Sequence, residues 1–174
     1  AFVLHTYSPA GESFCSARRL AQGAPKAPWG IEKKSREFEN YHLTLKIQPM
    51  DKSCLFCKII AKEIPSEVIY ENENTFAFLD INPLHPGHTL IVPKEHSENI
   101  LEISEKSYKA LAKTARKVAL AIKIGLKPDG INVHMNNESA AGQVVFHTHL
   151  HVIPRYIDDG FLPWHKSNHS QEEI

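Results

Sequence analysis

The sequence has 174 residues, of which 42% are hydrophobic and 23% are charged. This length suits one globular domain with a real core and is too short for two comfortable ones. Lys plus Arg and Asp plus Glu number 20 each, so no field of one sign indicates a nucleic-acid partner or an anionic membrane. No apolar run approaches the ~20 residues of a transmembrane helix.

The first 49 residues differ in composition and pattern from the rest of the sequence. Residues 1–30 are rich in Ala, Ser, Gly and Pro, with three basic residues and one acid. Residues 41–47 alternate apolar and polar side chains, which predicts an added edge strand. We expect residues 1–49 to be a disordered or non-native extension, with Met50 as the natural start. An organelle-targeting presequence is the alternative, because such segments are rich in Arg and Ser and poor in acids.

From residue 50 to 174 we expect one α+β domain with a short C-terminal tail. Consecutive strands in the predicted order can pair antiparallel, with the helices against one face of the sheet. The long helix is predicted from apolar residues spaced at i, i+3, i+4 and i+7, and Gly125 is predicted to end it. That spacing is set by Tyr108, Leu111, Ala112, Ala115, Val118, Ala119 and Ile122. In chain order the predicted elements are a short helix (54–61), a β-hairpin (66–71 and 75–80), a third strand (88–93), a long helix (104–124), a fourth strand (131–135), a loop (136–143) and a fifth strand (144–154).

Three histidines, His147, His149 and His151, alternate with uncharged residues in the predicted fifth strand. If the segment is extended, they share one face, about 6.6 Å from one to the next. They then span about 13 Å, whereas zinc–nitrogen bonds are ~2.0–2.1 Å, so one strand does not easily give all three to one ion. A three-histidine catalytic zinc site is therefore disfavoured. We favour one histidine as a nucleophile toward phosphorus, with neighbours that bind an anion or a metal.

Two of the three cysteines, Cys54 and Cys57, form a Cys-x-x-Cys motif. A tight turn at this spacing points both sulfurs at one centre, which suits zinc. A redox pair and two buried cysteines are the alternatives. A structural zinc needs two more ligands, and His96 and one of the three alternating histidines are candidates. An odd cysteine count with this motif favours a reducing compartment, so we expect a cytoplasmic protein.

Two further features fit a nucleotide. The small-residue loop from Ala140 to Gln143 offers backbone N–H groups that can cradle phosphate oxygens. Asp80, at a predicted strand end, can accept hydrogen bonds from both hydroxyls of a ribose, although such an Asp is more often part of a turn.

Together these motifs resemble the histidine triad superfamily, and the segment from Cys54 to His96 resembles its Hint branch. The resemblance runs from about Ser53 to Tyr156. It implies an antiparallel sheet meander extended across a homodimer, with a purine nucleotide or nucleotidyl conjugate at each site and no nucleic acid or membrane partner. It also implies an enzyme that cleaves a nucleoside monophosphate, AMP or GMP, from phosphoramidate or related conjugates through a nucleotidyl-histidine intermediate. A dinucleoside polyphosphate hydrolase and a nucleotide-binding regulatory protein with vestigial catalysis remain alternatives.

The resemblance also implies roles for individual residues. His149 is the implied nucleophile, His151 contacts the phosphate, and His88 supports the site. The other implied nucleotide-binding residues are Phe56, Phe78, Asp80, Ile81, Leu90, Asn136, Gly142, Gln143, Val144 and Val145. One structural Zn²⁺ per chain is implied on Cys54, Cys57, His96 and His147.

The sequence departs from the family pattern at two positions. Thr148 stands where an apolar residue is expected, and its methyl group can substitute at small cost. Val144 stands where many relatives have Ser, whose hydroxyl would reach the phosphate or the leaving group. Its loss is expected to slow turnover or to change the preferred leaving group.

Overall fold

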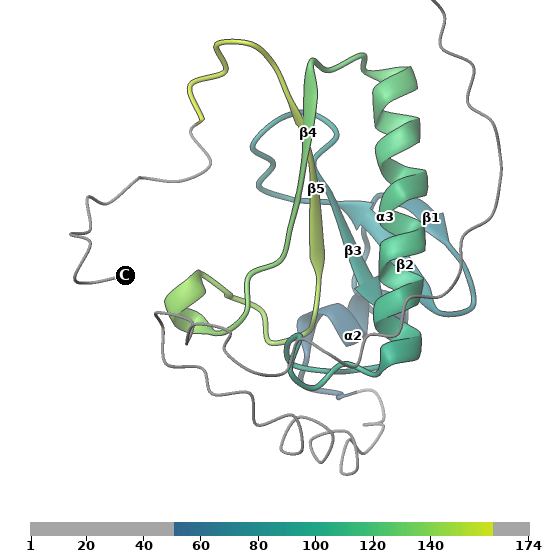
Figure 1. Cartoon of the computed structure of the whole chain (residues 1–174). Helices are drawn as coiled ribbons and strands as arrows, with labels where there is room; N and C mark the ends of the chain where they lie inside the picture. The colour runs from purple at the N-terminus through teal and green to yellow at the C-terminus, as the bar shows by residue number, and fades with distance from the viewer. Residues whose placement is uncertain (1–50, 162–174) are drawn as a thin grey trace, which may run out of the picture. The chain divides into compact units, whose positions relative to one another are not determined.

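The computed structural model describes residues 51–161 (Figure 1). The predicted extension over 1–49, the edge strand at 41–47 and the end of the C-terminal tail lie outside the described residues. Within residues 51–161, no helix is both long and apolar enough to span a membrane.

Five strands form one antiparallel sheet in the order β1-β2-β3-β5-β4. The predicted hairpin is confirmed, because β1 pairs antiparallel with β2. β4 and β5 form a second hairpin, but β5 rather than β4 adjoins β3, so β4 lies at the outer edge. The bounds are β1 Val68–Glu71, β2 Thr75–Leu79, β3 Thr89–Pro93, β4 Gly130–His134 and β5 Leu150–Arg155.

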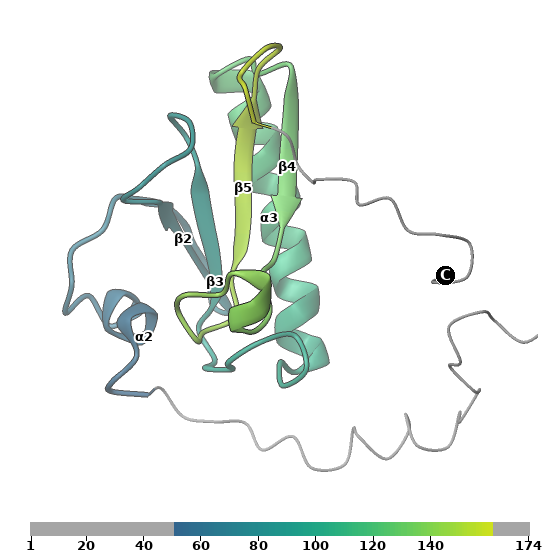
Figure 2. The same cartoon turned by 90° about the vertical axis from the view of Figure 1, so that its left-hand side faces the viewer.

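The helices cover opposite faces of the sheet (Figure 2), so the prediction that they share one face is wrong. Side chains alternate between the two faces along a strand. In β2, Phe76 and Phe78 pack with the short helix α2 (Leu55–Ile60), whereas Ala77 packs with the long helix α3 (Glu105–Gly125). A strand sequence that is apolar on both faces can cover a helix on each side.

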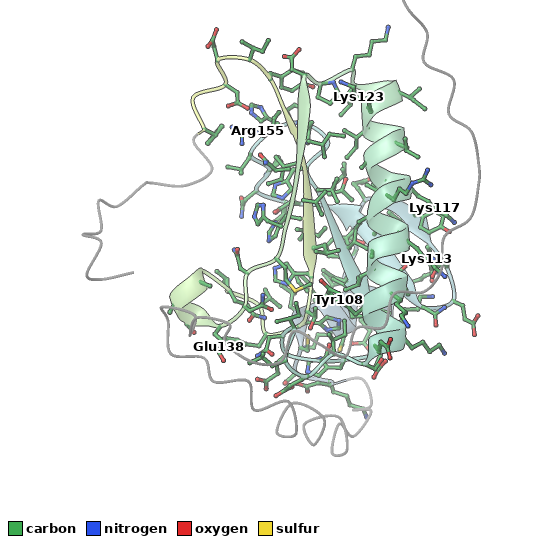
Figure 3. The ribbon with its side chains drawn as sticks, viewed as in Figure 1. Tyr108, Lys113, Lys117, Lys123, Glu138 and Arg155 are labelled. Carbon is green, nitrogen blue, oxygen red and sulfur yellow. The ribbon has the colours of Figure 1, made fainter. Side chains whose placement is uncertain are left out.

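Helix α3 follows the predicted bounds closely, but the set of residues that it buries differs from the predicted set. Tyr108 and Ala112 are exposed, and Ser107 and Thr114 are buried in their place. The Thr114 hydroxyl is tolerated because it lies 2.8 Å from the Thr75 hydroxyl on β2. The expected lysines lie on the outer side of the helix, Lys113 and Lys117 among them (Figure 3). Gly125 is the last helical residue rather than the stop.

The fifth strand begins later than predicted. β5 starts at Leu150, and the residues from Val144 to His149 form bends and extended loop instead of strand. The 3-10 helix η2 (Ser139–Ala141) precedes them in the connection from β4. In Figure 3, Glu138 in this connection and Arg155 at the end of β5 lie at opposite ends of the β4–β5 hairpin. Of the three alternating histidines, only His151 is therefore a strand residue, and the other two lie in the approach to the strand.

Candidate active site and metal site

Cys54, Cys57, His96 and His147 converge at one buried point. Cys54 precedes α2 and Cys57 lies in its first turn, so the helix start directs both sulfurs inward. His147 Nδ1 lies 3.4 Å from Cys54 Sγ and 3.3 Å from His96 Nδ1. Cys57 Sγ lies 3.4 Å from His96 Nδ1 and 3.6 Å from His147 Nδ1. Tetrahedral zinc with ordinary bond lengths sets its sulfur and nitrogen ligands about 3.6 Å apart and two nitrogens about 3.3 Å apart. The four residues therefore fit a zinc ion.

The protonation of His147 also suits a metal ligand. Its side chain is fully buried, and its Nε2–H donates to the Pro93 carbonyl at 3.0 Å, which leaves a lone pair on Nδ1 toward the cysteines. Burial lowers the pKa of His147 to about 4, so the imidazole is neutral at pH 7. Burial, with the neighbouring Cys54, raises the pKa of the Cys57 thiol to about 11. A cation is what makes the thiolate form favourable there.

His149 is joined to the metal-site residue His147 through the backbone. Its Nδ1–H donates to the His147 carbonyl oxygen at 2.6 Å, so the lone pair of the neutral ring is on Nε2. Burial lowers the pKa of His149, which favours this neutral form. The His149 and Phe56 rings pack in a T-shaped arrangement, with centroids 5.2 Å apart. His149 thus presents a neutral ring whose Nε2 lone pair is not engaged by the His147 carbonyl.

A second chain of hydrogen bonds fixes the tautomer of His151. The Leu84 N–H donates to His88 Nδ1 at 3.3 Å, so His88 carries its proton on Nε2. That Nε2–H donates to His151 Nδ1 at 2.9 Å, so His151 carries its own proton on Nε2. Burial and the neighbouring His149, His134 and His88 lower the pKa of His151 to about 3. A neutral ring with Nε2–H can donate a hydrogen bond to a phosphoryl oxygen or a leaving group.

Asp80 lies at the start of the β2–β3 loop, close to His88. Its Oδ1 accepts from the Asn82 N–H at 2.9 Å, and its Oδ2 lies 3.5 Å from His88 Nδ1. The Asp80 N–H donates to the His88 carbonyl at 2.9 Å and closes the loop. Gly87 has a φ of +92°, a conformation that is strained for residues with a side chain, and a Cβ there would also make the Leu126 side chain move, since Leu126 Cδ1 would lie 2.3 Å away.

The segment after β5 also anchors this loop. Asp159 accepts from Arg155 Nε at 2.6 Å and Nη2 at 2.7 Å, and its Oδ2 lies 3.2 Å from His85 Nε2. The Arg155 guanidinium holds the pKa of Asp159 well below its usual range. Because His85 belongs to the loop that carries Asp80 and His88, these contacts tie the C-terminal segment to the site.

The residues implied to wall a base separate into two groups. Phe56, Phe78 and Leu90 are buried in the cluster beneath α2, with the rings of Phe56 and Phe78 in edge contact at 5.5 Å. Ile81 is 91% exposed in the β2–β3 loop and packs with none of them.

The expectation for the small-residue loop is wrong for three of its amides. The N–H groups of Ala141, Gly142 and Gln143 donate within the loop, to the carbonyls of Ser139 and Glu138 at 3.0–3.1 Å. These N–H groups already donate within the loop, so they are not available to donate to a phosphate. In contrast, the N–H groups of Val144 and Val145 donate to no acceptor within residues 51–161. They are the amides left for an anion.

The side chains of this loop hold its shape. Asn136 Nδ2 lies 3.4 Å from the Gly142 carbonyl. Gln143 is buried, and its amide nitrogen donates to the Glu98 carbonyl at 2.6 Å and the Val145 carbonyl at 3.1 Å. Val144 is 87% exposed. Gln143 therefore has a structural role here, whereas the Val144 side chain is free to meet a ligand.

Thr148 shows why a hydroxyl is acceptable at an apolar position of the pattern. The residue is buried, but its hydroxyl donates to the Ser97 carbonyl at 3.0 Å and lies 2.9 Å from the Ser97 hydroxyl. A buried hydroxyl with partners costs little. Ser97 follows His96, so this contact also helps to join the two histidine segments of the metal site.

Sequence reasoning missed His134. Its ring stacks on the His151 ring, with centroids 4.8 Å apart and planes 16° apart. The sequence places His134 in a strand, but only the pairing of β4 with β5 brings it to the site.

The fold and the two sites define an α+β protein in which a buried Cys₂His₂ cluster that could hold a metal ion adjoins a cluster of neutral histidines. The chain belongs to the HIT family, because the model of the HIT domain matches residues 61–158. The resemblance to the histidine triad superfamily is thereby confirmed.

Relatives from several organisms match. An uncharacterized HIT-like protein of Borreliella burgdorferi is 50% identical over 62% of this chain and 79% of that protein. The adenosine 5'-monophosphoramidase HNT1 of Saccharomyces cerevisiae is 41% identical over 61% of this chain and 65% of its own length. The adenylylsulfatase HINT3 of Arabidopsis thaliana is 41% identical over 61% of this chain and 54% of its own. A zinc-bound histidine triad family protein from Mycobacterium smegmatis superposes with a TM-score of 0.61 at 38% identity, covering 70% of this chain and 86% of that one.

Proposed function

We propose that this protein is a hydrolase that cleaves a nucleoside monophosphate, AMP or GMP, from phosphoramidate or related conjugates. The observation that carries the proposal is the pattern of hydrogen bonds that assigns one tautomer to each of two adjacent histidines. His149 is held with a free lone pair on Nε2, and His151 is held with a proton on Nε2. The ring centroids of the two lie 5.0 Å apart. A nucleophile and a hydrogen-bond donor for the phosphoryl oxygens are thus adjacent, an arrangement that suits nucleophilic catalysis at phosphorus.

The proposed reaction has two steps. His149 Nε2 attacks the α-phosphorus, the bond from phosphorus to the leaving nitrogen breaks, and the leaving amine takes a proton from solvent, while His151 Nε2–H donates a hydrogen bond to a phosphoryl oxygen. A water then attacks the phosphorus of the nucleotidyl-histidine, and the proton that this water loses returns to solvent. The second step releases the nucleoside monophosphate and frees His149 Nε2. His88 stabilises the required tautomer of His151 through the 2.9 Å hydrogen bond.

The remaining residues are proposed to bind the nucleotide. Asp80 has an Oδ2 that is not engaged by the Asn82 N–H, and it would accept from the ribose hydroxyls. The free amides of Val144 and Val145 would meet phosphate oxygens. Ile81 and the edge of the buried aromatic cluster would contact the base. Two relatives named adenosine 5'-monophosphoramidase and adenylylsulfatase support a substrate in which the leaving group departs from an adenylyl phosphorus.

We propose that one structural Zn²⁺ binds the Cys₂His₂ set. All four donors would be protein side chains, so no position stays open for water, and the ion would supply no chemistry beyond holding its ligands. The residue that transmits its effect is His147, whose carbonyl accepts from His149 Nδ1. The distances between donor atoms and the zinc-bound relative from M. smegmatis support this assignment.

We also propose a homodimer with an extended sheet, in the cytoplasm. Within residues 51–161, β1 and β4 each pair on one side only, and an unpaired edge can accept a strand of a second copy. The two free, buried thiols of the metal site favour a reducing compartment.

The test is hydrolysis of a fluorogenic adenosine phosphoramidate by the intact protein and by His149→Ala. Turnover by the intact protein alone, with an adenylyl adduct on the peptide containing His149, is the expected result. The melting temperature of the variant controls for folding. AMP binding without turnover and without an adduct would refute the proposed phosphoramidase activity.

A second candidate is a nucleotide-binding protein with vestigial catalysis. The observation that favours it is the exposed Val144, which offers no hydroxyl to the phosphate or the leaving group. Testing a dinucleoside polyphosphate in parallel separates a change of leaving group from a loss of catalysis.

A further inference from the structure

His134 is the last residue of β4 and the cross-strand partner of His151 on β5. Residues two apart in a strand share a face, so Asn132 and His134 point to the face that carries His151. Val133 points to the opposite face and is exposed. The position of His134 beside His151 is therefore fixed by backbone pairing.

The two rings lie almost parallel, with centroids 4.8 Å apart and planes 16° apart. The other neighbours of His151 contact it differently. His88 donates to its Nδ1 with the His88 ring tilted by 37° at a centroid distance of 5.2 Å, and the His149 ring is tilted by 59° at 5.0 Å, so neither stacks flat on His151. A single hydrogen bond at one ring atom permits the imidazole to swing about that bond, because the terminal torsion of histidine has a broad minimum. A ring stacked on its face restricts that swing.

We infer that His134 is a positioning residue that holds the His151 ring in the plane where Nδ1 accepts from His88 and Nε2–H faces the reacting phosphoryl group. The inference rests on the proposed function for its catalytic consequence. The ring stack provides this restraint. A flat side chain at position 134 limits rotation of the His151 ring from the β4 side, where neither His88 nor His149 stacks on it.

The electrostatic surroundings are compatible with this role. Burial lowers the pKa of His134, so the ring is neutral at pH 7 and two neutral rings stack without repulsion. The other titratable groups that contact His151 or its hydrogen-bond partner are His88 and His149, with Asp80 beyond His88. Within residues 51–161, His134 makes no side-chain hydrogen bond to any of them, so its contribution comes from its shape and not from a shared proton.

The experiment compares His134→Ala with His134→Phe, which keeps a flat ring but has no nitrogen. With the fluorogenic adenosine phosphoramidate, we expect His134→Ala to lower kcat by about two- to tenfold, the order of one aromatic pair, with little change in KM. We expect His134→Phe to restore most of kcat. If Phe is as impaired as Ala, or if KM rises in both variants while kcat does not fall, His134 acts through its nitrogens on the substrate and the positioning role is refuted.

A second measurement does not depend on turnover. Long-range ¹H–¹⁵N spectra report which ring nitrogen of a histidine carries the proton, and His151→Asn assigns the signal. We expect the Nε2–H tautomer of His151 in the intact protein and in His134→Phe, and a mixture of tautomers in His134→Ala. An unchanged tautomer in His134→Ala would overturn the inference. Lack of phosphoramidase turnover in the intact protein would instead refute the proposed function alone.

Discussion

Removal of zinc is expected to lower both the stability and the activity of this protein. The four donors are buried, and the sulfur–nitrogen and nitrogen–nitrogen contacts among them measure 3.3–3.6 Å, so they form a site in the folded chain and none in the unfolded chain. Two thiolates and two neutral imidazoles around Zn²⁺ sum to zero charge, which is acceptable in a buried place. Without the ion, the Cys57 thiol is protonated at pH 7, because its pKa is about 11.

The magnitude follows from linkage. An ion that binds only the folded chain, at a free concentration a thousand times its Kd, stabilises the fold by about 4 kcal/mol. For a chain of this size, 1 kcal/mol changes Tm by roughly 2–4 °C. We therefore expect chelation to lower Tm by about 8–16 °C. The kcat should fall as well, since the His147 carbonyl holds the tautomer of His149.

The assay is thermal unfolding and phosphoramidate turnover, before and after dialysis against a strong chelator, with zinc content measured by mass spectrometry. Cys57→Ala is the matched control: it should start at a lower Tm and respond little to the chelator. Re-addition of zinc should restore the intact protein and leave the variant unchanged. A zinc-free protein with the original Tm would refute the reasoning.

Three further outcomes are expected. Val144→Ser should raise kcat by about tenfold or more, because a hydrogen bond to a charged group is worth ~1.5–3 kcal/mol. The control variant Val144→Ala should not raise kcat. Neither variant should change the free energy of unfolding by more than ~0.5 kcal/mol at this exposed position. An equal kcat in the two variants would contradict a role for the hydroxyl. The acid limb of kcat/KM should lie below pH ~6.5, because burial lowers the pKa of His149 and keeps its lone pair free; a limb at or above that pH would count against His149 as the nucleophile. Asp159→Asn should lower the urea midpoint more at pH 7 than at pH 3, because the depressed pKa of Asp159 stabilises the fold in full above its unfolded value of ~3.9, and this advantage shrinks as the pH falls from there toward the folded pKa. An equal loss at both pH values would show that the carboxylate charge is not the cause.

The sequence by itself determined the features that depend on neighbours in the chain. The helix α3, the strands β2 and β3 and the hairpin of β1 with β2 could be predicted, because local patterns of apolar and turn-forming residues indicate such elements. The Cys-x-x-Cys spacing predicted that both sulfurs meet at one centre, since a single helical turn sets that geometry. The resemblance of the motifs to a family supplied the choice of His96 and His147.

Only the tertiary structure decided which distant side chains meet. His88 and His151 are 63 residues apart, and their hydrogen bond exists because β3 and β5 are adjacent. His134 joins them only because β4 pairs on the other side of β5. In the loop before β5 the sequence prediction was wrong: its small residues predicted free amide N–H groups, but three of these groups form hydrogen bonds within the loop itself. Competition of that kind for backbone hydrogen bonds leaves no periodic signal in a sequence, since it depends on the fold that each N–H group finds around it.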